Sequence, residues 1–240
     1  GESHGYFVFP EMSADSLYTL MCVDYEVQDE DAWHAHSRHL LYQSPKSGYY
    51  RFPVEMGNKY LIRRLQLGQE TPINISFTHS IRTPQQLAGA MGQKLLLDSA
   101  EVIQRLTDKT YLAQYGLTPE TAVCLFIPNT YEVYWTMTAD QLFARMYKEY
   151  QRFWNEERRA KAKDLGLTPV EVATLASIVA SETNKTSEHP LIASLYLNRL
   201  NKGIALQACP TVIYAVGNFK MRRVLKRHLA IDSPYNTYKN

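Results

Sequence analysis

The chain has 240 residues, of which 45% are apolar, and this length is enough for one large domain or two modest ones. Lys and Arg number 26 and Asp and Glu 24, which gives a net charge of +2. So small a charge does not indicate a nucleic-acid partner or an anionic membrane surface. The three cysteines are far apart and form neither a CxxC pair nor a Cys/His ligand spacing, so the sequence predicts no metal site and no disulfide framework.

The first seventy residues predict a small unit of strands and helices. "YFVF" indicates a strand, Ser13 caps a short helix, and "DAWHAHSRHLL" predicts a second helix. The strand "SGYYRFP" follows, and then the helix "GNKYLIRRLQLG", which ends at Gly68. The segment from Gly68 to Pro72 is the expected boundary, so we predict one domain over residues 1–70 and a second over residues 71–240.

The second domain mixes strands and helices. It starts with the alternating strand "INISF" and a helix that has Thr83 as its cap and Pro84 in its first turn. A buried strand with a Pro-Asn turn comes next, and the segment from Thr138 to Gly166 predicts one long amphipathic helix. No βαβ rhythm is present, so the predicted fold class is α+β. The aromatic side chains of the long helix repeat at helical spacing and are expected in the core: Phe143, Tyr147, Tyr150, Phe153 and Trp154.

One carboxylate lies on the apolar side of a predicted helix. The segment "LTPVEVATLASIVASET" begins with Thr168 as the cap and Glu171 three residues later, which is a capping box. Glu182, near the end of this helix, falls on the same side as Leu175 and Val179. The opposite side carries small residues, so we expect a helix that is buried all round, Glu182 included.

The expected position of Glu182 suggests a chemical role. Burial and the negative end of the helix dipole would both favour a protonated carboxyl group. A glutamate that holds a proton near neutral pH can act as a general acid and, once the proton has left, as a general base. The helix pattern leaves a structural alternative open, in which Glu182 emerges at the helix end and pairs with Lys185 or Arg199.

The segments after Glu182 are rich in polar and aromatic side chains. A helix begins at Pro190, ends at Gly203 and carries Arg199 at the end of its apolar side. Hydroxyls, amides and aromatic rings suit a saccharide site, because they bond to sugar hydroxyls and stack on pyranose faces. The following segments supply Gln207, Thr211, Tyr214, Ser233, Tyr235, Asn236 and Tyr238.

Several blocks of the sequence resemble a known family. "ASIVASET", "LIASLYLNRLNKGIALQ", "PTVIYAVG" and "DSPYNTY" are similar, in this order, to the signature blocks of the YceG-like endolytic murein transglycosylases, the MltG family. "SGYYRFP" and "FIPNTYEVYW" resemble two further blocks, so the resemblance covers most of residues 48–238. Residues 1–47 match weakly, but their order of elements suits the LysM-like subdomain of this family. The resemblance implies a small LysM-like N-terminal subdomain followed by a mixed α/β YceG-like catalytic domain.

The resemblance also implies an activity. The family cleaves the β-1,4 bond between N-acetylmuramic acid and N-acetylglucosamine inside peptidoglycan strands and leaves a 1,6-anhydro end. Glu182 matches its catalytic glutamate, which protonates the glycosidic oxygen and then deprotonates the C6 hydroxyl of the sugar; no metal, cofactor or enzymic nucleophile is needed. Arg199 would support the site or hold its helix end. By the same match, the glycan groove would be lined by Gln207, Thr211, Tyr214, Tyr235, Asn236 and Tyr238.

The chain departs from the family pattern at two places. Cys209 stands before Pro-Thr where the family most often has an acid. The chain stops at Asn240, before a Gly/Pro-rich stretch and a C-terminal portion, so we expect a truncated catalytic domain. The resemblance further implies the periplasmic face of the bacterial inner membrane, an N-terminal membrane anchor that a chain starting at Gly1 lacks, and peptidoglycan synthases as partners.

Two other functions stay open at this point. An ordinary glycoside hydrolase would use Glu182 as the acid and Asp232 or Glu188 as the base, and its product would carry a reducing end. A peptidoglycan-binding module or a scaffold for wall synthesis would use Glu182 only to anchor a helix. Such a module would bind glycan strands without creating new ends.

Overall fold

The structure, a computed structural model, describes residues 3–24, 31, 35 and 45–240. The predicted helix "DAWHAHSRHLL" lies almost entirely outside these residues. Contacts within the chain divide it into two compact units, Gly1–Lys148 and Glu149–Asn240. The domain boundary near residue 70 stays a prediction.

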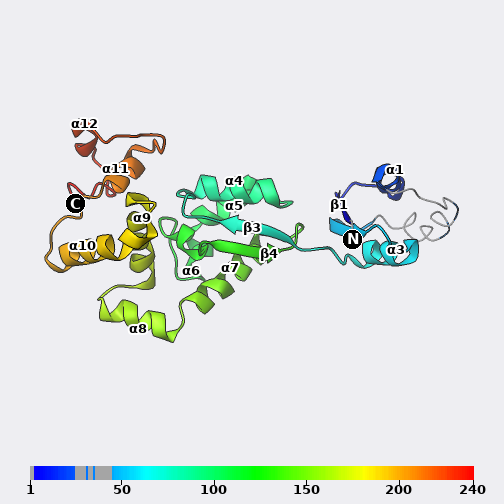
Figure 1. Cartoon of the computed structure of the whole chain (residues 1–240), viewed down its shortest axis with the longest axis horizontal. Coiled ribbons are helices and arrows are strands. Elements are labelled where there is room, and N and C mark those ends of the chain that lie inside the picture. The colour runs from blue at the N-terminus through cyan, green and yellow to red at the C-terminus, as the bar shows by residue number, and fades with distance from the viewer. Residues whose placement is uncertain (1–2, 25–30, 32–34, 36–44) are drawn as a thin grey trace. The chain divides into compact units, whose positions relative to one another are not determined.

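The first unit begins with a two-stranded sheet covered by two helices (Figure 1). Strands β1 and β2 run antiparallel, with Ser3 opposite Pro53 and Val8 opposite Gly48. Alternate residues of each strand point into one core, as the period of a strand requires. Helix α3 ends at Gly68, whose φ of 66° is the left-handed conformation that glycine adopts readily, as the sequence predicts. The elements are β1 (Ser3–Val8), α1 (Ala14–Asp24), β2 (Gly48–Pro53) and α3 (Asn58–Leu67).

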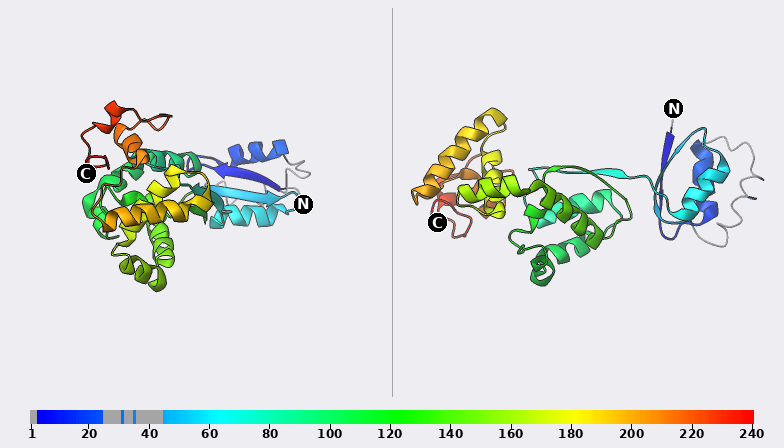
Figure 2. Two further views of the ribbon diagram at one scale, coloured as in Figure 1. Left: turned by 60° about the vertical axis from the view of Figure 1, so that its left-hand side comes forward. Right: turned by 90° about the horizontal axis from the view of Figure 1, so that it is seen from below.

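A second two-stranded sheet forms the rest of the first unit, with helices beside it (Figure 2). Its strands are antiparallel, with Ile73 opposite Val133 and Phe77 opposite Asn129. Thr83 caps the helix that follows the first strand, because its side chain accepts a hydrogen bond from the backbone N–H of Gln86 at 3.2 Å, as predicted. The elements are β3 (Ile73–Phe77), α4 (Pro84–Lys94), α5 (Ser99–Thr107), α6 (Lys109–Ala113), the 3-10 turn η1 (Ala122–Leu125) and β4 (Asn129–Val133).

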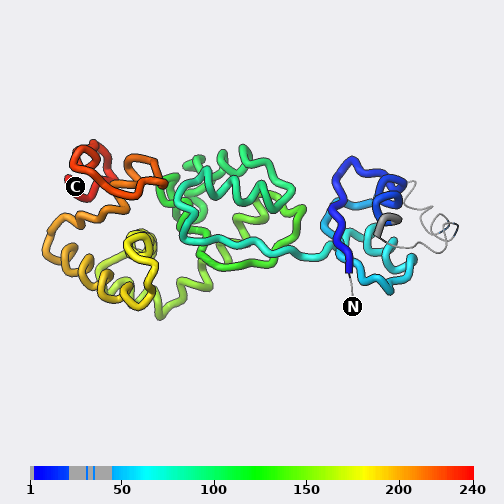
Figure 3. Tube along the Cα trace, turned by 45° about the horizontal axis from the view of Figure 1, so that its top comes forward, coloured from blue at the N-terminus to red at the C-terminus, as the bar shows by residue number. Residues whose placement is uncertain are grey.

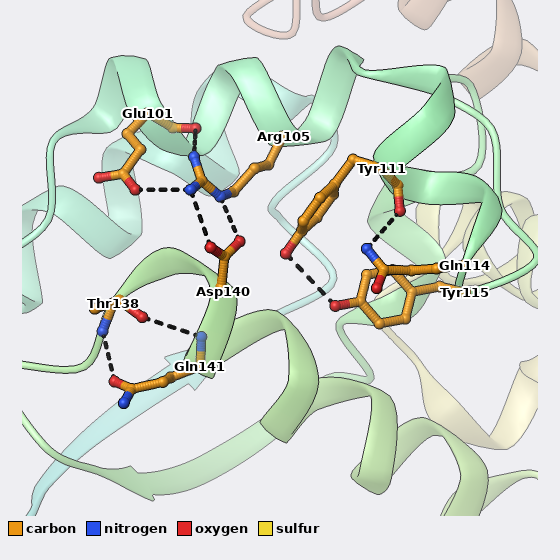
Figure 4. Close-up of polar contacts among 8 residues, drawn as sticks. All are labelled: Glu101, Arg105, Tyr111, Gln114, Tyr115, Thr138, Asp140 and Gln141. Atoms are coloured by element: carbon orange, nitrogen blue, oxygen red, sulfur yellow. Dashed lines mark hydrogen bonds and ion pairs between the residues drawn. The ribbon is translucent and has the colours of Figure 1, made fainter.

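A charged clamp ties α5 and α6 to the helix α7 (Ala139–Phe153) (Figure 4). The Nε and Nη2 atoms of Arg105 donate to the two carboxylate oxygens of Asp140 at 2.7 and 3.2 Å, and Nη2 lies 3.0 Å from Oε1 of Glu101. Hydrogen bonds from Arg105 and then from Tyr111 lower the pKa of Asp140 from its ordinary value. A two-pronged contact of this kind fixes both distance and orientation between the helices.

The second unit consists of helices and turns. Helices α9 and α10 pack side by side, and Leu175, Val179, Tyr196 and Ala208 form the centre of their core (Figure 2). The final segment of the chain folds back beside α11 (Figure 3). The elements are α8 (Glu156–Asp164), α9 (Pro169–Glu182), the 3-10 turn η2 (Thr186–Glu188), α10 (His189–Asn201), α11 (Cys209–Val216) and α12 (Lys226–Leu229).

The prediction of one long helix from Thr138 to Gly166 is wrong, because α7 and α8 are separate. The side chain of Asn155 accepts a hydrogen bond from the backbone N–H of Arg158 at 2.9 Å and caps α8. Asparagine competes with the helical backbone in this way, so it starts a helix more readily than it continues one. The aromatic residues Phe143, Tyr150 and Trp154 are buried as predicted, whereas 37% of Phe153 is exposed.

Within the described residues, no single helix is long and apolar enough to cross a membrane. Only α8 and α9, taken together across a bend of 77°, meet such a test by length and composition.

The clamp gives a stability prediction for Asp140→Asn. Because the pKa of Asp140 is lowered in the folded state, its contribution is present above the pKa of the unfolded chain, about 4, and is lost as the pH falls through the folded value. At pH about 7 we expect the variant to lose up to about 1 kcal/mol in the free energy of unfolding, and this difference from wild type should shrink towards pH about 3. Urea unfolding at several pH values measures both quantities.

The matched control is Glu157→Gln on α8. Glu157 forms an ion pair with Lys161 at 2.7 Å, and 71% of the Glu157 side chain and 70% of the Lys161 side chain are exposed. Because water screens such an exposed pair, Glu157→Gln should change the stability by less than Asp140→Asn does. An equal loss in both variants, or a loss in Asp140→Asn that does not depend on pH, would contradict the role assigned to the clamp.

Candidate active site

Glu182 is the last residue of α9, and the helix that carries it begins as predicted. The side chain of Thr168 accepts from the backbone N–H of Glu171 at 3.3 Å, and the carboxylate of Glu171 accepts from the N–H of Thr168 at 2.7 Å. These reciprocal bonds lower the pKa of Glu171 from its ordinary value. After Glu182 the chain becomes extended at Thr183, with φ −148° and ψ 144°, so the helix ends at the candidate acid.

The prediction that α9 is buried all round is wrong. Leu175 and Val179 are its buried residues, whereas Ala176 and Ser177 on the opposite side are exposed, and so is Glu182. The helix packs against α10 and α11 and touches α8, and its other side is exposed. Burial therefore does not supply, in this conformation, the reason for a protonated Glu182 that the sequence suggested.

Tyr196 of α10 contacts the Glu182 carboxylate directly. Its hydroxyl donates a hydrogen bond to Oε1 of Glu182 at 2.7 Å. Only 5% of Tyr196 is exposed, so its ring is part of the core while its hydroxyl reaches the edge of that core. The pKa of Tyr196 is raised, first by burial and then by the bond to the carboxylate. Tyr196 is not among the site residues predicted from the sequence.

The two cations considered as partners of Glu182 bind elsewhere. Lys185 forms an ion pair with Glu188 at 3.3 Å, and Glu188 also accepts from the hydroxyl of Thr183 at 2.9 Å. Arg199 donates from Nε to the backbone oxygen of Ala205 at 2.7 Å. The structural alternative, in which one of these cations pairs with Glu182, is therefore not the arrangement observed.

Gln207 occupies a strained backbone position beside this site. Its φ of 55° is the one positive value for a non-glycine residue in the part of the chain that the structure describes. A side chain in this conformation costs about 1–3 kcal/mol, and such strain often occurs at binding sites. Oε1 of Gln207 accepts from Nη2 of Arg199 at 3.0 Å, and its backbone N–H donates to the oxygen of Thr237 at 2.9 Å. Arg199 thus holds the loop that carries Gln207.

The chain's last segment is fixed to the start of α11 by Thr237. Its hydroxyl oxygen accepts from the backbone N–H of Ala208 at 3.0 Å and lies 2.8 Å from the hydroxyl of Thr211. Thr211 is buried and also donates to the backbone oxygen of Ala208 at 2.8 Å. Thr237 lies within the block "DSPYNTY", but the sequence analysis selected only its neighbours.

Asn236 is fully buried and holds the loop around it. Its Nδ2 atom donates to the backbone oxygens of Leu229 and Ile231 at 3.0 and 2.8 Å, and its Oδ1 atom accepts from the N–H of Tyr238 at 3.1 Å. In this conformation neither Asn236 nor the buried Thr211 presents its side chain to a ligand. These two residues were predicted to contact glycan directly, whereas in the structure they hold the surrounding loops in place.

Cys209 and Tyr238 lie near the carboxylate. The Cys209 Sγ atom is 3.4 Å from the Tyr238 hydroxyl, and Cys209 is exposed. The hydrogen bond with Cys209, followed by burial, raises the pKa of Tyr238 to about 12, and the charge of Glu182 contributes in the same direction. When ionised, Cys209 and Tyr238 also raise the pKa of Tyr196. The position where the sequence departs from its family is thus part of the Glu182 surroundings.

Tyr214 and Tyr235 form an aromatic pair within the same unit. Their ring centres are 4.9 Å apart at an angle of 70°, and the ring of Phe219 is 6.1 Å from that of Tyr214. Tyr235 is 43% exposed, whereas burial raises the pKa of Tyr214. An exposed ring with a fixed orientation can stack on the apolar face of a sugar.

A profile of the YceG-like family matches residues 8–240. The chain belongs to the YceG-like family. The fold agrees, because a YceG-like protein from Listeria monocytogenes with a solved crystal structure superimposes with a TM-score of 0.64 at 22% identity, over 100% of this chain and 83% of that one. The predicted family and the mixed helix and strand fold class are confirmed.

Two curated relatives of this YceG-like chain are named endolytic murein transglycosylase. The protein from Bacillus subtilis (strain 168) is 26% identical over 244 residues, which cover 95% of the chain and 67% of the relative. The protein from Streptococcus pneumoniae serotype 2 (strain D39) is 28% identical over 238 residues, which cover 85% of the chain and 42% of the relative. These names agree with the prediction of an enzyme of the lytic transglycosylase class.

The internal role of Asn236 can be tested by Asn236→Ala. The change leaves two partly buried backbone oxygens and one partly buried N–H without their partner, so we expect a loss of about 2 kcal/mol in the free energy of unfolding. The control is Asn240→Ala, which removes one exposed bond to the oxygen of Ser233 and should cost less than about 1 kcal/mol. Stability like that of wild type in Asn236→Ala, together with weaker glycan binding, would show a direct contact instead.

Proposed function

We propose that this YceG-like chain is the catalytic part of an endolytic peptidoglycan lytic transglycosylase, with Glu182 as its single general acid and base. The observation that carries the proposal is the position of Glu182, at the exposed end of a helix and bonded to a core tyrosine. The family match and the names of the two relatives support it. The chain spans 67% and 42% of those relatives, so the activity of the whole protein is part of the proposal.

The proposed reaction proceeds in two proton transfers. Glu182 gives its proton to the glycosidic oxygen as the bond from C1 of N-acetylmuramic acid to that oxygen breaks. The C6 hydroxyl oxygen of the same sugar attacks C1, and its proton passes to the Glu182 carboxylate. A 1,6-anhydro end and a free N-acetylglucosamine hydroxyl result, the glutamate is restored and no water is consumed. A single carboxyl group is enough, whereas ordinary glycosidases use two.

An exposed glutamate needs a change of surroundings to act as an acid near neutral pH. A glycan strand over Glu182 would exclude water and favour the uncharged carboxyl group. Tyr235, Tyr238 and Gln207 provide exposed or half-buried groups for such a strand, and the buried Asn236 and Thr211 hold the loops that carry them. We therefore assign the substrate-binding role to the first three residues, and to Tyr214 through its contact with Tyr235.

The remaining expectations from the resemblance belong to this proposal. They are a LysM-like fold for the N-terminal part, a position at the periplasmic face of the inner membrane through an N-terminal anchor, and peptidoglycan synthases as partners. Hydrolysis is the less favoured alternative, because Glu188, one of the two carboxylates considered as a base, is paired with Lys185. A module without activity is less favoured because the relatives are named as enzymes.

Digestion of purified peptidoglycan tests the proposal. Wild type should release fragments with anhydro-muramyl ends, and Glu182→Gln should lower the rate by about 10²-fold or more, since general acid–base groups contribute about 10²–10⁴-fold. Mass spectrometry of the products measures both results.

Glu188→Gln is the matched control, because Glu188 lies six residues further on in the chain and binds Lys185 and Thr183. It should retain the activity of wild type within about twofold. Reducing ends together with an inactive Glu188→Gln would establish a hydrolase. No new ends from wild type would contradict catalysis by this chain.

A further inference from the structure

The Tyr196 hydroxyl is the group that joins Glu182 to the core of the second unit. It donates to Oε1 of Glu182 at 2.7 Å, and its ring packs with Leu175, Val179 and Ala208. We infer that Tyr196 is a positioning residue, which holds the Glu182 carboxyl group in one orientation throughout the reaction. This inference rests on the proposed function of Glu182.

Among the residues that the structure describes, no other hydrogen bond or ion pair fixes the Glu182 side chain. It is exposed, it is the last residue of α9, and the backbone leaves the helical conformation directly after it. A free glutamate side chain samples several rotamers, and confining it at the moment of reaction costs conformational entropy. The hydrogen bond from Tyr196 restricts the Glu182 side chain before the reaction begins. Tyr196 can do so because its own ring is packed in the core and only 5% exposed.

The direction of the hydrogen bond suits both proton transfers. While Glu182 is protonated, Oε1 can remain the carbonyl oxygen that accepts from Tyr196, and Oε2 carries the proton. After the proton has passed to the glycosidic oxygen, the same bond becomes charge-assisted and therefore stronger. Oε2 is then free to take the proton of the C6 hydroxyl. Tyr196 keeps its own proton at each stage, since burial and the adjacent carboxylate raise its pKa.

The other titratable groups around this contact come from three segments. Cys209 lies at the start of α11 and Tyr238 in the final segment, and each raises the pKa of Tyr196 when it is ionised. The positive charge of Arg199, on α10, opposes the rise in the pKa of Tyr238. All three stay unchanged in the experiment below, so a change in kcat reports the lost hydroxyl.

Tyr196→Phe removes the hydroxyl and keeps the ring. We expect kcat on peptidoglycan to fall by roughly tenfold to a hundredfold with KM changed less than about twofold, because the acid is misplaced while the groove is retained.

Tyr131→Phe is the matched control. Tyr131 is 6% exposed, and its hydroxyl donates at 2.7 Å to the backbone oxygen of Ile127. Each variant loses a hydrogen bond of the same length from a buried tyrosine. Both variants should therefore remain folded, and thermal unfolding should show similar losses of stability. Only Tyr196→Phe should change kcat.

A third variant tests whether Tyr196 acts through Glu182. Glu182→Asp withdraws the carboxylate from the Tyr196 hydroxyl, so adding Tyr196→Phe to it should lower the remaining rate by less than about twofold. Independent, multiplying losses, or kinetics of Tyr196→Phe equal to those of Tyr131→Phe, would overturn the inference. Full activity of Glu182→Gln would instead overturn the proposed function, so the two failures can be told apart.

Discussion

A hydrogen bond of 2.7 Å, from the hydroxyl of Tyr196 to Oε1 of Glu182, connects the packed centre of the second unit to the end of α9, where the backbone turns away and the candidate acid becomes exposed. The bond depends on how α9 and α10 pack, because the Tyr196 ring belongs to the same core cluster as Leu175 and Val179. Changes in this core would therefore reach the Glu182 carboxylate through this hydrogen bond as well as through α9 itself. An exposed carboxyl group can in this way be as well oriented as a buried one.

Hydrogen bonds from residues near the end of the chain hold the segments around Glu182 in place. Thr237 fixes the final segment to the start of α11, and the fully buried Asn236 holds the turn that carries Tyr238. The strained backbone of Gln207 is kept in place from two sides, by Arg199 and by the oxygen of Thr237. Blocks that are separate in the sequence therefore meet because a few buried polar groups form hydrogen bonds with one another. The exposed hydroxyls and rings beside them are the groups that we propose for glycan binding.

Features decided by neighbouring residues could be predicted from the sequence. The capping box of Thr168 and Glu171, the Thr83 cap and the left-handed Gly68 involve at most four consecutive residues, and all three are found. The break at Asn155 was missed because the residues after it, Glu, Arg, Ala and Lys, also favour a helix, although an asparagine before a charged turn is a signal for a new helix. The family and the fold class could be predicted because the signature blocks occur in order.

The surroundings of Glu182 could not be predicted in the same way, because exposure is decided by which faces of α9 find a partner. A helical wheel treats small residues such as Ala176 as a packing surface, whereas the structure leaves this side open. Tyr196 was missed because a tyrosine on an apolar stripe looks like a core residue, and it is one, except for its hydroxyl. Two residues that seemed suited to bind sugar, Asn236 and Thr211, are buried because their side chains complete the loops.

The most direct test of the central claim, one carboxyl group acting with the C6 hydroxyl of the substrate, is digestion of peptidoglycan in water enriched in heavy oxygen. Mass spectrometry of the new ends then shows which oxygen has attacked C1. We expect anhydro ends without the heavy isotope, since no water enters the product. Reducing ends that carry the isotope would show that water is the nucleophile, and would contradict the assignment of Glu182 as the single acid and base.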